Sequence, residues 1–437
     1  MRLFLSESAQ IGKQVLFRSG REVSRRYASS SASTSTSTPV VDALRDSVSS
    51  VSASTGNRAL QFLGSGSRHR VGARALSTLV GRPGGLDSVE VSDVAFERPR
   101  ILAGGCGDVS SRLLRLAAEQ PLAEVFIIQP NGSKPPLSVL PPNVKLIWAD
   151  DSSGSPFTNT DYLSRVIKDH GITEFFPGWG NLSEDPIQLA VLQNVLGKRG
   201  RILGPNLSFI SDVGHKGNAR VLAQKAGVPI VPGADGLVTE ANFTQMMSVF
   251  KAGIPIMFKA PESGGGYGMR KAIVGRDDVA MHKEACREGK CEGLVAEQFL
   301  DDEFEHFEIQ SFGVQFSEDV APQTFPLRLE RDCSVQWRNA KWVQLSNPAG
   351  LPEPVRDKMV NSSRNLGNLA RQMGPATHEY LVITKPDTAQ NRDYLMGKYR
   401  ATDTDLITSD GKVYLVVYNE TNPRLQVEHP VTEMAYR

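Results

Sequence analysis

Glu420-Thr421-Asn422-Pro423-Arg424-Leu425-Gln426-Val427-Glu428-His429-Pro430 is the stretch on which the interpretation of this chain depends. In an extended backbone, alternate side chains point to opposite faces, which places the even-numbered residues from 422 to 428 on one side. Arginine and glutamine hold a small planar oxyanion through directed hydrogen bonds, and Glu428 can take a proton from it. Glu420 and Asn422 carry the hard oxygen ligands that magnesium prefers. The alternative is an edge strand with a solvated polar face.

Composition narrows the class of protein. The chain has 437 residues, a hydrophobic fraction of 40% and a formal net charge of +1. This length predicts two or three domains. The balanced charge gives no electrostatic case for nucleic acid or a membrane surface as partner, and no apolar run is long enough to span a bilayer. The cysteines show neither metal-ligand spacing nor a disulfide framework, which indicates a reducing compartment.

Residues 1–95 are expected to lie outside the folded part, as a targeting peptide followed by a disordered Ser-rich segment. Basic residues outnumber acidic ones before Arg26, and the apolar residues among them are consistent with an amphipathic helix. Arg25-Arg26-Tyr27-Ala28-Ser29 is similar to a mitochondrial presequence cleavage site. The expected location is mitochondrial. A plastid address is the main alternative, and an arbitrary disordered tail is the other.

Short apolar strands then alternate with helical patterns, which predicts a parallel α/β sheet. Strands are expected at 99–103, 125–128, 144–147, 172–176 and 202–205, with helices near 113–117, 162–170 and 185–196. The glycines from Gly104 to Gly107 lack the full spacing of a dinucleotide site and are interpreted as tight-turn residues. The segment 212–216 is expected to open a helix that runs to Ala226. Near such a helix start, Lys216 can meet phosphate.

An apolar strand at 254–260 carries a single charge, Lys259, and leads into a glycine-rich loop. A buried lysine is costly unless an anion or carboxylate meets it. The four glycines Gly264, Gly265, Gly266 and Gly268 let backbone N–H groups approach a polyphosphate closely. The combination favours a phosphate-binding lid over a flexible hairpin tip. It is not the usual P-loop, which requires Lys-Ser or Lys-Thr after its last glycine.

The later segments are expected to continue with strands and one helix. An apolar strand at 294–300 carries Glu297, and the alternation at 306–310 predicts a partner strand for it. The charged segment 328–341 is also consistent with a solvated hairpin. A helix is expected at 359–373, and a strand at 413–418 delivers Glu420.

The motifs together resemble the biotin carboxylases, the ATP-grasp domains of biotin-dependent acetyl-CoA, propionyl-CoA and pyruvate carboxylases. The resemblance is carried, in family order, by Lys216, Lys259 with the glycine-rich loop, Glu297, Glu330-Arg331-Asp332-Cys333-Ser334 and Asn422–His429. It implies an N-terminal parallel α/β (pre-ATP-grasp) domain at 96–215. An ATP-grasp α+β domain at 216–437 would follow, with a mobile lid subdomain at about 231–299. The C-terminal part of the family fold and the biotinyl and carboxyltransferase domains are expected to be missing.

The resemblance also implies an activity. The family forms carboxyphosphate from bicarbonate and MgATP and passes CO2 to a nitrogen of protein-bound biotin. ATP, Mg2+ (or Mn2+) and biotin on a carrier domain are the implied cofactors. A carboxyltransferase and further copies of this chain are the implied partners.

Site residues carry over from the same motifs. Those implied to bind the nucleotide are Lys216, Lys259, Gly264, Gly265, Gly266, Gly268, Glu297, Gln298, Leu300, His306 and Gln336. Those implied to hold bicarbonate or act as base are Arg424, Gln426, the Val427 backbone, Lys341 and Glu428, with Glu428 as general base. Those implied to hold the metal are Glu420, Asn422 and Asp405, with Asp403 as the alternative to Asp405.

Several positions depart from the family pattern. Tyr267 stands where the lid normally carries Lys or Arg, Asn339 replaces a histidine, and Gln344-Leu345 replaces a pair of glutamates. An aspartate replaces the usual second glutamate of the metal site. Two functions therefore stay open: an active biotin carboxylase or fragment of one, and a degenerate or regulatory nucleotide-binding homologue without turnover. Another ATP-grasp ligase acting on a different carboxylate is the third alternative.

Overall fold

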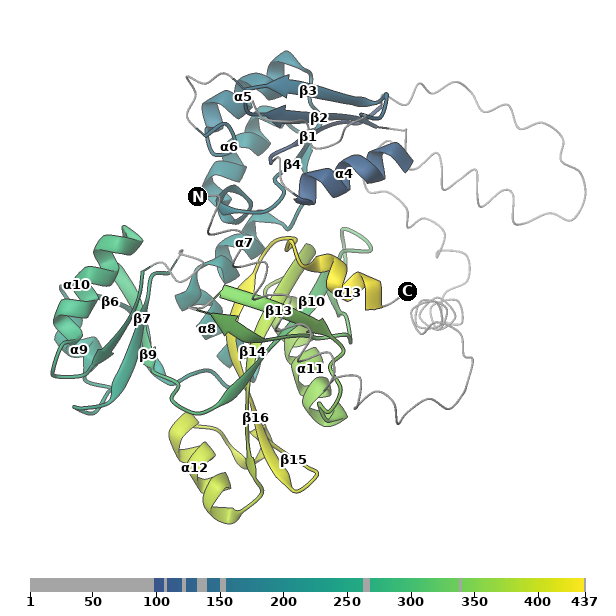
Figure 1. Cartoon of the computed structure of the whole chain (residues 1–437). Coiled ribbons are helices and arrows are strands. Elements are labelled where there is room, and N and C mark those ends of the chain that lie inside the picture. The colour runs from purple at the N-terminus through teal and green to yellow at the C-terminus, as the bar shows by residue number, and fades with distance from the viewer. Residues whose placement is uncertain are drawn as a thin grey trace, which may run out of the picture. The chain divides into compact units, whose positions relative to one another are not determined.

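Three sheets make up the part of the chain that the computed structural model describes, residues 98–105, 108–119, 123–131, 140–149, 155–261, 268–337 and 340–435 (Figure 1). The expected targeting segment lies outside these residues. The lid positions Gly264, Gly265, Gly266 and Tyr267 lie outside them too, as does Asn339. None of the helices in the described ranges combines the length and the apolar character that crossing a membrane requires.

The first sheet is parallel and five-stranded, in the order β3-β2-β1-β4-β5. Its elements are β1 (Arg100–Ala103), α4 (Asp108–Glu119), β2 (Glu124–Gln129), β3 (Val144–Trp148), α5 (Thr160–Asp169), β4 (Glu174–Phe176), η2 (Asn181–Glu184), α6 (Pro186–Leu196) and β5 (Arg201–Ile202). Phe126 and Phe175 are buried in its core, as expected for strands whose two faces are both covered. The predicted parallel α/β alternation is confirmed.

Two helices replace the single helix predicted to open at 212–216. Asp212 to Gly214 end α7 (Leu207–Gly214), and a new helix, α8 (Lys216–Lys225), begins two residues later. His215 separates them with an extended backbone, and its ring accepts a hydrogen bond from the Asn218 N–H. This cap makes Lys216 the first residue of α8.

The second sheet is antiparallel and four-stranded, in the order β6-β9-β7-β8. Its elements are β6 (Gly233–Thr239), α9 (Phe243–Met247), β7 (Pro255–Lys259), β8 (Met269–Ile273), α10 (Asp278–Gly289) and β9 (Gly293–Gln298). Apolar side chains of α9 and α10 pack with Phe258 and Leu294 in one core. We call residues 233–298 the lid subdomain, since they fall within the segment to which the sequence assigned a lid.

The third sheet is antiparallel and seven-stranded, in the order β13-β12-β10-β14-β16-β15, with β11 paired to β10. Its elements are β10 (Phe304–Val314), β11 (Gln323–Pro326), β12 (Arg331–Trp337), β13 (Ala340–Ser346), α11 (Glu353–Leu369), β14 (Gly374–Pro386), α12 (Ala389–Tyr399), η3 (Asp403–Asp405), β15 (Leu406–Ser409), β16 (Lys412–Asn422) and α13 (His429–Ala435). The predicted pairing of 306–310 with the preceding apolar strand is wrong, because β10 belongs to this sheet and β9 to the lid subdomain. The helix predicted at 359–373 begins earlier, at Glu353.

The motif at 420–430 is extended only as far as Asn422, where β16 ends. Pro423 has no N–H to donate to a strand ladder, and the Arg424 N–H turns back to the carbonyl of Asn422 at 2.9 Å. A turn then leads into α13, which begins at His429. The predicted single row of alternating polar side chains is therefore wrong beyond the strand.

Candidate active site

Two carboxylates face each other across the central strands of the third sheet. Glu379 on β14 is the register partner of Glu420 on β16, and the amide of Asn422 donates to Glu379 Oε1 at 2.7 Å. The register shifts between Glu379 and Tyr380, so that Asn419 is an extra residue on β16. Such a bulge re-aims the side chains that follow it. Lys216 Nζ, at the start of α8, lies 3.9 Å from Glu420 Oε2.

Asp405, predicted as a metal ligand, is not part of this cluster. Its carboxylate accepts from the N–H and hydroxyl of Thr402 at 3.0 and 2.7 Å, and it pairs with Lys358 at 3.2 Å. The neighbouring strand β15 reaches β16 at the pair Leu406–Leu415. Glu420 is five residues further along β16, a separation of about 17 Å at the usual rise per residue. The structure thus places Glu379, not Asp405, beside Glu420.

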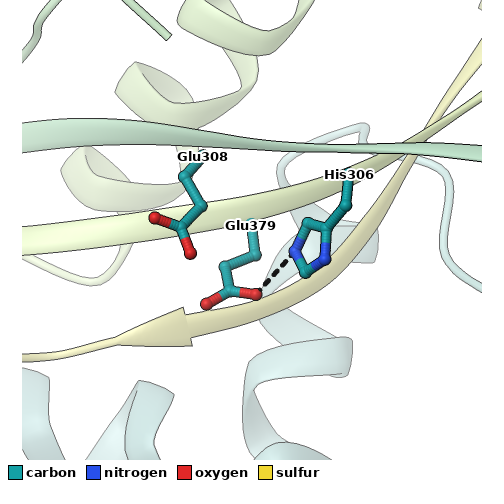
Figure 2. A group of neighbouring side chains, drawn as sticks. All are labelled: His306, Glu308 and Glu379. Atoms are coloured by element: carbon teal, nitrogen blue, oxygen red, sulfur yellow. Dashed lines mark hydrogen bonds and ion pairs between the residues drawn. The ribbon is translucent and has the colours of Figure 1, made fainter. Parts of the chain in front are cut away.

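Glu379 is also part of a buried group with His306 and Glu308 (Figure 2). His306 Nε2 lies 2.7 Å from Glu379 Oε2. The Gln336 amide donates both to His306 Nδ1 at 2.7 Å and to the Cys333 carbonyl at 2.8 Å. Because Nδ1 accepts, Nε2 carries the proton and donates to Glu379. The predicted nucleotide contacts His306 and Gln336 therefore also orient a candidate metal ligand.

Lys341 and Arg331 balance the charge of these carboxylates. Lys341 Nζ is 2.8 Å from Glu379 Oε1 and also pairs with Glu308. Burial disfavours the charged form of Glu308 and Glu379 and is the largest single effect on each. Lys341 acts with Arg331 on Glu308 and with His306 on Glu379, and together these partners lower the pKa of both carboxyls. Burial also works against the Lys341 ammonium, yet the two carboxylates raise its pKa. All three groups are charged at neutral pH.

Arg331 links this group to the motif at 420–430. Its fully buried guanidinium donates to Glu308 Oε2 at 2.5 and 3.1 Å and to Gln310 and Thr432 at 2.9 Å each. It also donates to the side-chain carbonyl of Gln426. The alternative of a solvated hairpin at 328–341 is wrong for Arg331, because this side chain is fully buried beside Glu308.

The lid subdomain brings two of the predicted nucleotide residues together. Lys259 on β7 pairs with Glu297 on β9, whose other oxygen accepts from Arg220 of α8 at 2.8 Å. The Lys216 N–H donates to the Pro261 carbonyl at 3.2 Å, which joins the start of α8 to the chain leaving β7. At the far end of the loop, Gly268 has φ +64°, and a Cβ there would lie 2.6 Å from that of Ala260. Only glycine fits this turn.

The residues predicted to hold bicarbonate have protein partners. Arg424 Nε donates to Glu184 in η2, the short helix that follows β4 of the parallel sheet. Arg112 donates to the Val427 carbonyl at 2.6 Å. Glu428 follows in the turn and is half-buried. Arg424, Gln426 and Lys341 are thus oriented by Glu184, Arg331 and Glu308, respectively.

Sequence reasoning missed Glu379, and a signal was available. It is an acid at the head of an apolar run, Tyr380–Ile383, on a strand whose middle is fully buried. The same argument that singled out Lys259 applies, since a charge in an apolar strand needs a partner.

The chain is similar in sequence to known ATP-binding domains and carboxylases. Residues 215–394 match the family described as carbamoyl-phosphate synthase L chain, ATP binding domain. The chain is 29% identical over 350 residues to a pyruvate carboxylase of Pichia angusta, covering 78% of this chain. It is 27% identical to biotin carboxylase 1 of Bacillus subtilis, covering 77% of this chain. The resemblance to biotin carboxylase domains is confirmed.

A solved structure supports the same fold. A Rhizobium etli pyruvate carboxylase superposes with a TM-score of 0.59 and 25% identity over 77% of this chain. The chain spans 26% of the length of the Pichia relative and 67% of the Bacillus one. The N-terminal parallel sheet followed by antiparallel ATP-grasp sheets is the architecture that the sequence predicted.

Proposed function

We propose that the chain catalyses the ATP- and bicarbonate-dependent carboxylation of biotin, the first half-reaction of an acyl-CoA or pyruvate carboxylase. The observation that carries the proposal is the pairing of Glu379 with Glu420 beside Asn422, with Lys216 and Lys341 in contact with the two carboxylates. Two carboxylates and one amide are a hard-oxygen set that suits magnesium. Glu379, Glu420 and Asn422 therefore fit Mg2+, which would offset the negative charge of a bound phosphate group.

The other site residues form two groups, one for the nucleotide and one for bicarbonate. Lys216, at the helix start, and Lys259, at the exit of β7, would neutralise phosphates under the lid, while Glu297 to Leu300 would line the adenine. Arg424, Gln426 and the Val427 backbone would bind bicarbonate on the other side, with Glu428 taking its proton. Biotin on a carrier domain, a carboxyltransferase and a second copy of the chain are the partners proposed.

A nucleotide-binding homologue without turnover is the second candidate. One observation favours it: the groups assigned to anions, Lys259, Arg424 and Gln426, are each paired with a protein side chain, Glu297, Glu184 and Arg331. Binding of substrate must displace or share these contacts, which costs affinity.

Bicarbonate-dependent ATP hydrolysis in the presence of free biotin distinguishes the two. The proposal expects activity with both substrates, its loss in Arg424→Ala and Glu428→Gln, and retained MgADP binding in both variants. MgADP binding without turnover in the unmodified chain would establish the second candidate. Failure to bind MgADP at all would overturn both.

We further propose a mitochondrial location, from the segment 1–95. We expect a reporter fused to this segment to be imported into isolated mitochondria. The double variant Arg25→Glu/Arg26→Glu should lose this import. Uptake by chloroplasts instead would favour the plastid alternative.

A further inference from the structure

The lid subdomain is joined to the rest of the chain by two crossings, residues 226–232 and 299–303. They are joined where they meet the lid subdomain, because the Gln298 N–H at the end of β9 donates to the Pro232 carbonyl at 2.7 Å. Any rotation of residues 233–298 as a body must be absorbed here, where the strands end. The second crossing follows directly on Gln298 and contains Leu300, two of the residues assigned to the adenine.

The first crossing is anchored on the third sheet. The Tyr418 N–H of β16 donates to the Pro229 carbonyl at 2.8 Å, and Arg220 donates to the Val231 carbonyl at 2.7 Å. Val231 is 1% exposed and packs in a small core that contains Leu395 and Tyr399 of α12. This crossing is therefore fixed up to Pro232.

The second crossing packs on the same core and ends in a dense polar contact. Leu300 packs against the cluster that holds Val231 and Tyr399. The carboxylate of Asp302, 7% exposed, accepts from Tyr399 Oη at 2.6 Å, Lys398 Nζ at 2.8 Å, Lys385 Nζ at 2.9 Å and Tyr394 Oη at 3.1 Å. A carboxylate can accept about four hydrogen bonds, so these four donors use the full accepting capacity of Asp302. The Phe299 N–H still donates to the Pro255 carbonyl of β7 at 2.9 Å, so the link between the lid subdomain and these anchors on this side is Phe299–Leu300.

Most of these contacts come from one segment, residues 387–411, which we call the excursion. It joins the antiparallel partners β14 and β16 and contains α12, η3 and β15. A hairpin connection needs only about 2–5 residues, and longer ones are commonly functional. Figure 1 shows α12 beside β16, at the end where Ile383 and Leu415 are paired. Nothing in the sheet pairing requires the helix.

We propose that the excursion is a hinge clamp for the nucleotide lid. By holding Val231 and Leu300 in one core and Asp302 in one polar contact, it confines lid rotation to the links Val231–Pro232 and Phe299–Leu300. It thereby positions the adenine-facing segment Gln298–Leu300. Asp302 and Tyr399 are positioning residues in this scheme. The inference rests on the proposed nucleotide site.

Asp302→Asn tests the clamp, with Asp301→Asn as the matched control. Asp301 is the neighbouring acid in the same crossing, its side chain is 59% exposed, and it pairs with Lys398 alone among the contacts found in the described residues. Asp302→Asn removes the charge from the contact and is expected to weaken MgADP binding about tenfold, as a clamped population falls to about a tenth. Asp301→Asn is expected to leave binding within about twofold of the unmodified chain, as for other exposed ion pairs.

Tyr399→Phe provides a variant that keeps the apolar core and removes a single donor, with an expected loss of about threefold. Hydrogen exchange gives the second readout. The expected result for Asp302→Asn is faster exchange in residues 233–303, with the first sheet unchanged. In steady-state assays KM for ATP should rise while kcat is retained.

Three results would overturn the clamp: binding unchanged in Asp302→Asn, equal loss in both aspartate variants, or exchange raised throughout the chain, which would make Asp302 a general structural anchor. Absence of MgADP binding in the unmodified chain is a separate outcome that refutes the proposed function instead.

Discussion

Glu379 and Glu420 stand opposite each other on β14 and β16, one residue before the register of these strands shifts. Two acids in direct cross-strand pairing repel unless a cation or hydrogen bonds offset them. Here Lys341 and Asn422 contact Glu379 at 2.8 and 2.7 Å, and Lys216 approaches Glu420. The proposed magnesium site rests on this arrangement.

Glu379→Gln should therefore weaken magnesium-dependent nucleotide binding strongly. Replacing a ligand or its partner in a metal site commonly costs about 10–100-fold in affinity. Calorimetric titration of ADP at several magnesium concentrations measures the effect. Asp405→Asn is the matched control, since its carboxylate caps η3 and pairs with Lys358. If both variants lost the same amount of ADP affinity, the assignment of Glu379 in place of Asp405 as a metal ligand would be contradicted.

Arg331→Met should destabilise the fold far more than Arg328→Met, although the two arginines are neighbours on the chain. Arg331 is fully buried against Glu308, and removing one partner leaves an uncompensated charge, which costs about 3–5 kcal/mol. Arg328 is about half exposed and pairs with Glu353 and Asp357, a kind of contact worth about 0–1 kcal/mol. Urea unfolding at pH 7.5 compares them. Similar midpoints for the two variants would contradict the assigned roles.

His378 should steepen the loss of stability in mild acid. Burial lowers its pKa from 6.5 to about 3, and its ring contacts the Ser311 and Thr421 hydroxyls at 3.0 and 2.9 Å. The unfolded chain therefore binds a proton below pH 6.5 that the folded chain does not, and folding stability falls as pH falls. Between pH 6.5 and 5 this amounts to about 2 kcal/mol.

In His378→Gln, the free energy of unfolding should fall less between pH 6.5 and 5, by the same amount of about 2 kcal/mol. This holds whatever the stability of the variant at pH 7.5. Urea unfolding of both proteins across this pH range measures the two slopes. Parallel profiles for the two proteins would show that His378 does not titrate as a buried neutral group.

Local patterns in the sequence were sufficient to predict the parallel sheet and the strand that carries Lys259. The alternation of apolar strands and helices from Arg98 to Pro205 predicts the parallel sheet, because its strands are covered on both faces and carry continuous apolar runs. The single charge on the strand at 254–260 likewise indicates Lys259, since a buried lysine needs an anionic partner. Lys259 does meet one, Glu297 of β9.

The pairing between segments far apart in the chain could be seen only in the tertiary structure. The acid paired with Glu420 is Glu379 and not Asp405, because β14 lies beside β16 and a bulge at Asn419 brings Glu420 into register with Glu379. The turn after Pro423 sends Arg424 to Glu184 and Gln426 to Arg331. Sequence determined which chemical groups this protein has, since residue type and local period are written in it. Tertiary structure decided which of them meet, because register, bulges and chain crossings depend on contacts between residues far apart in the chain.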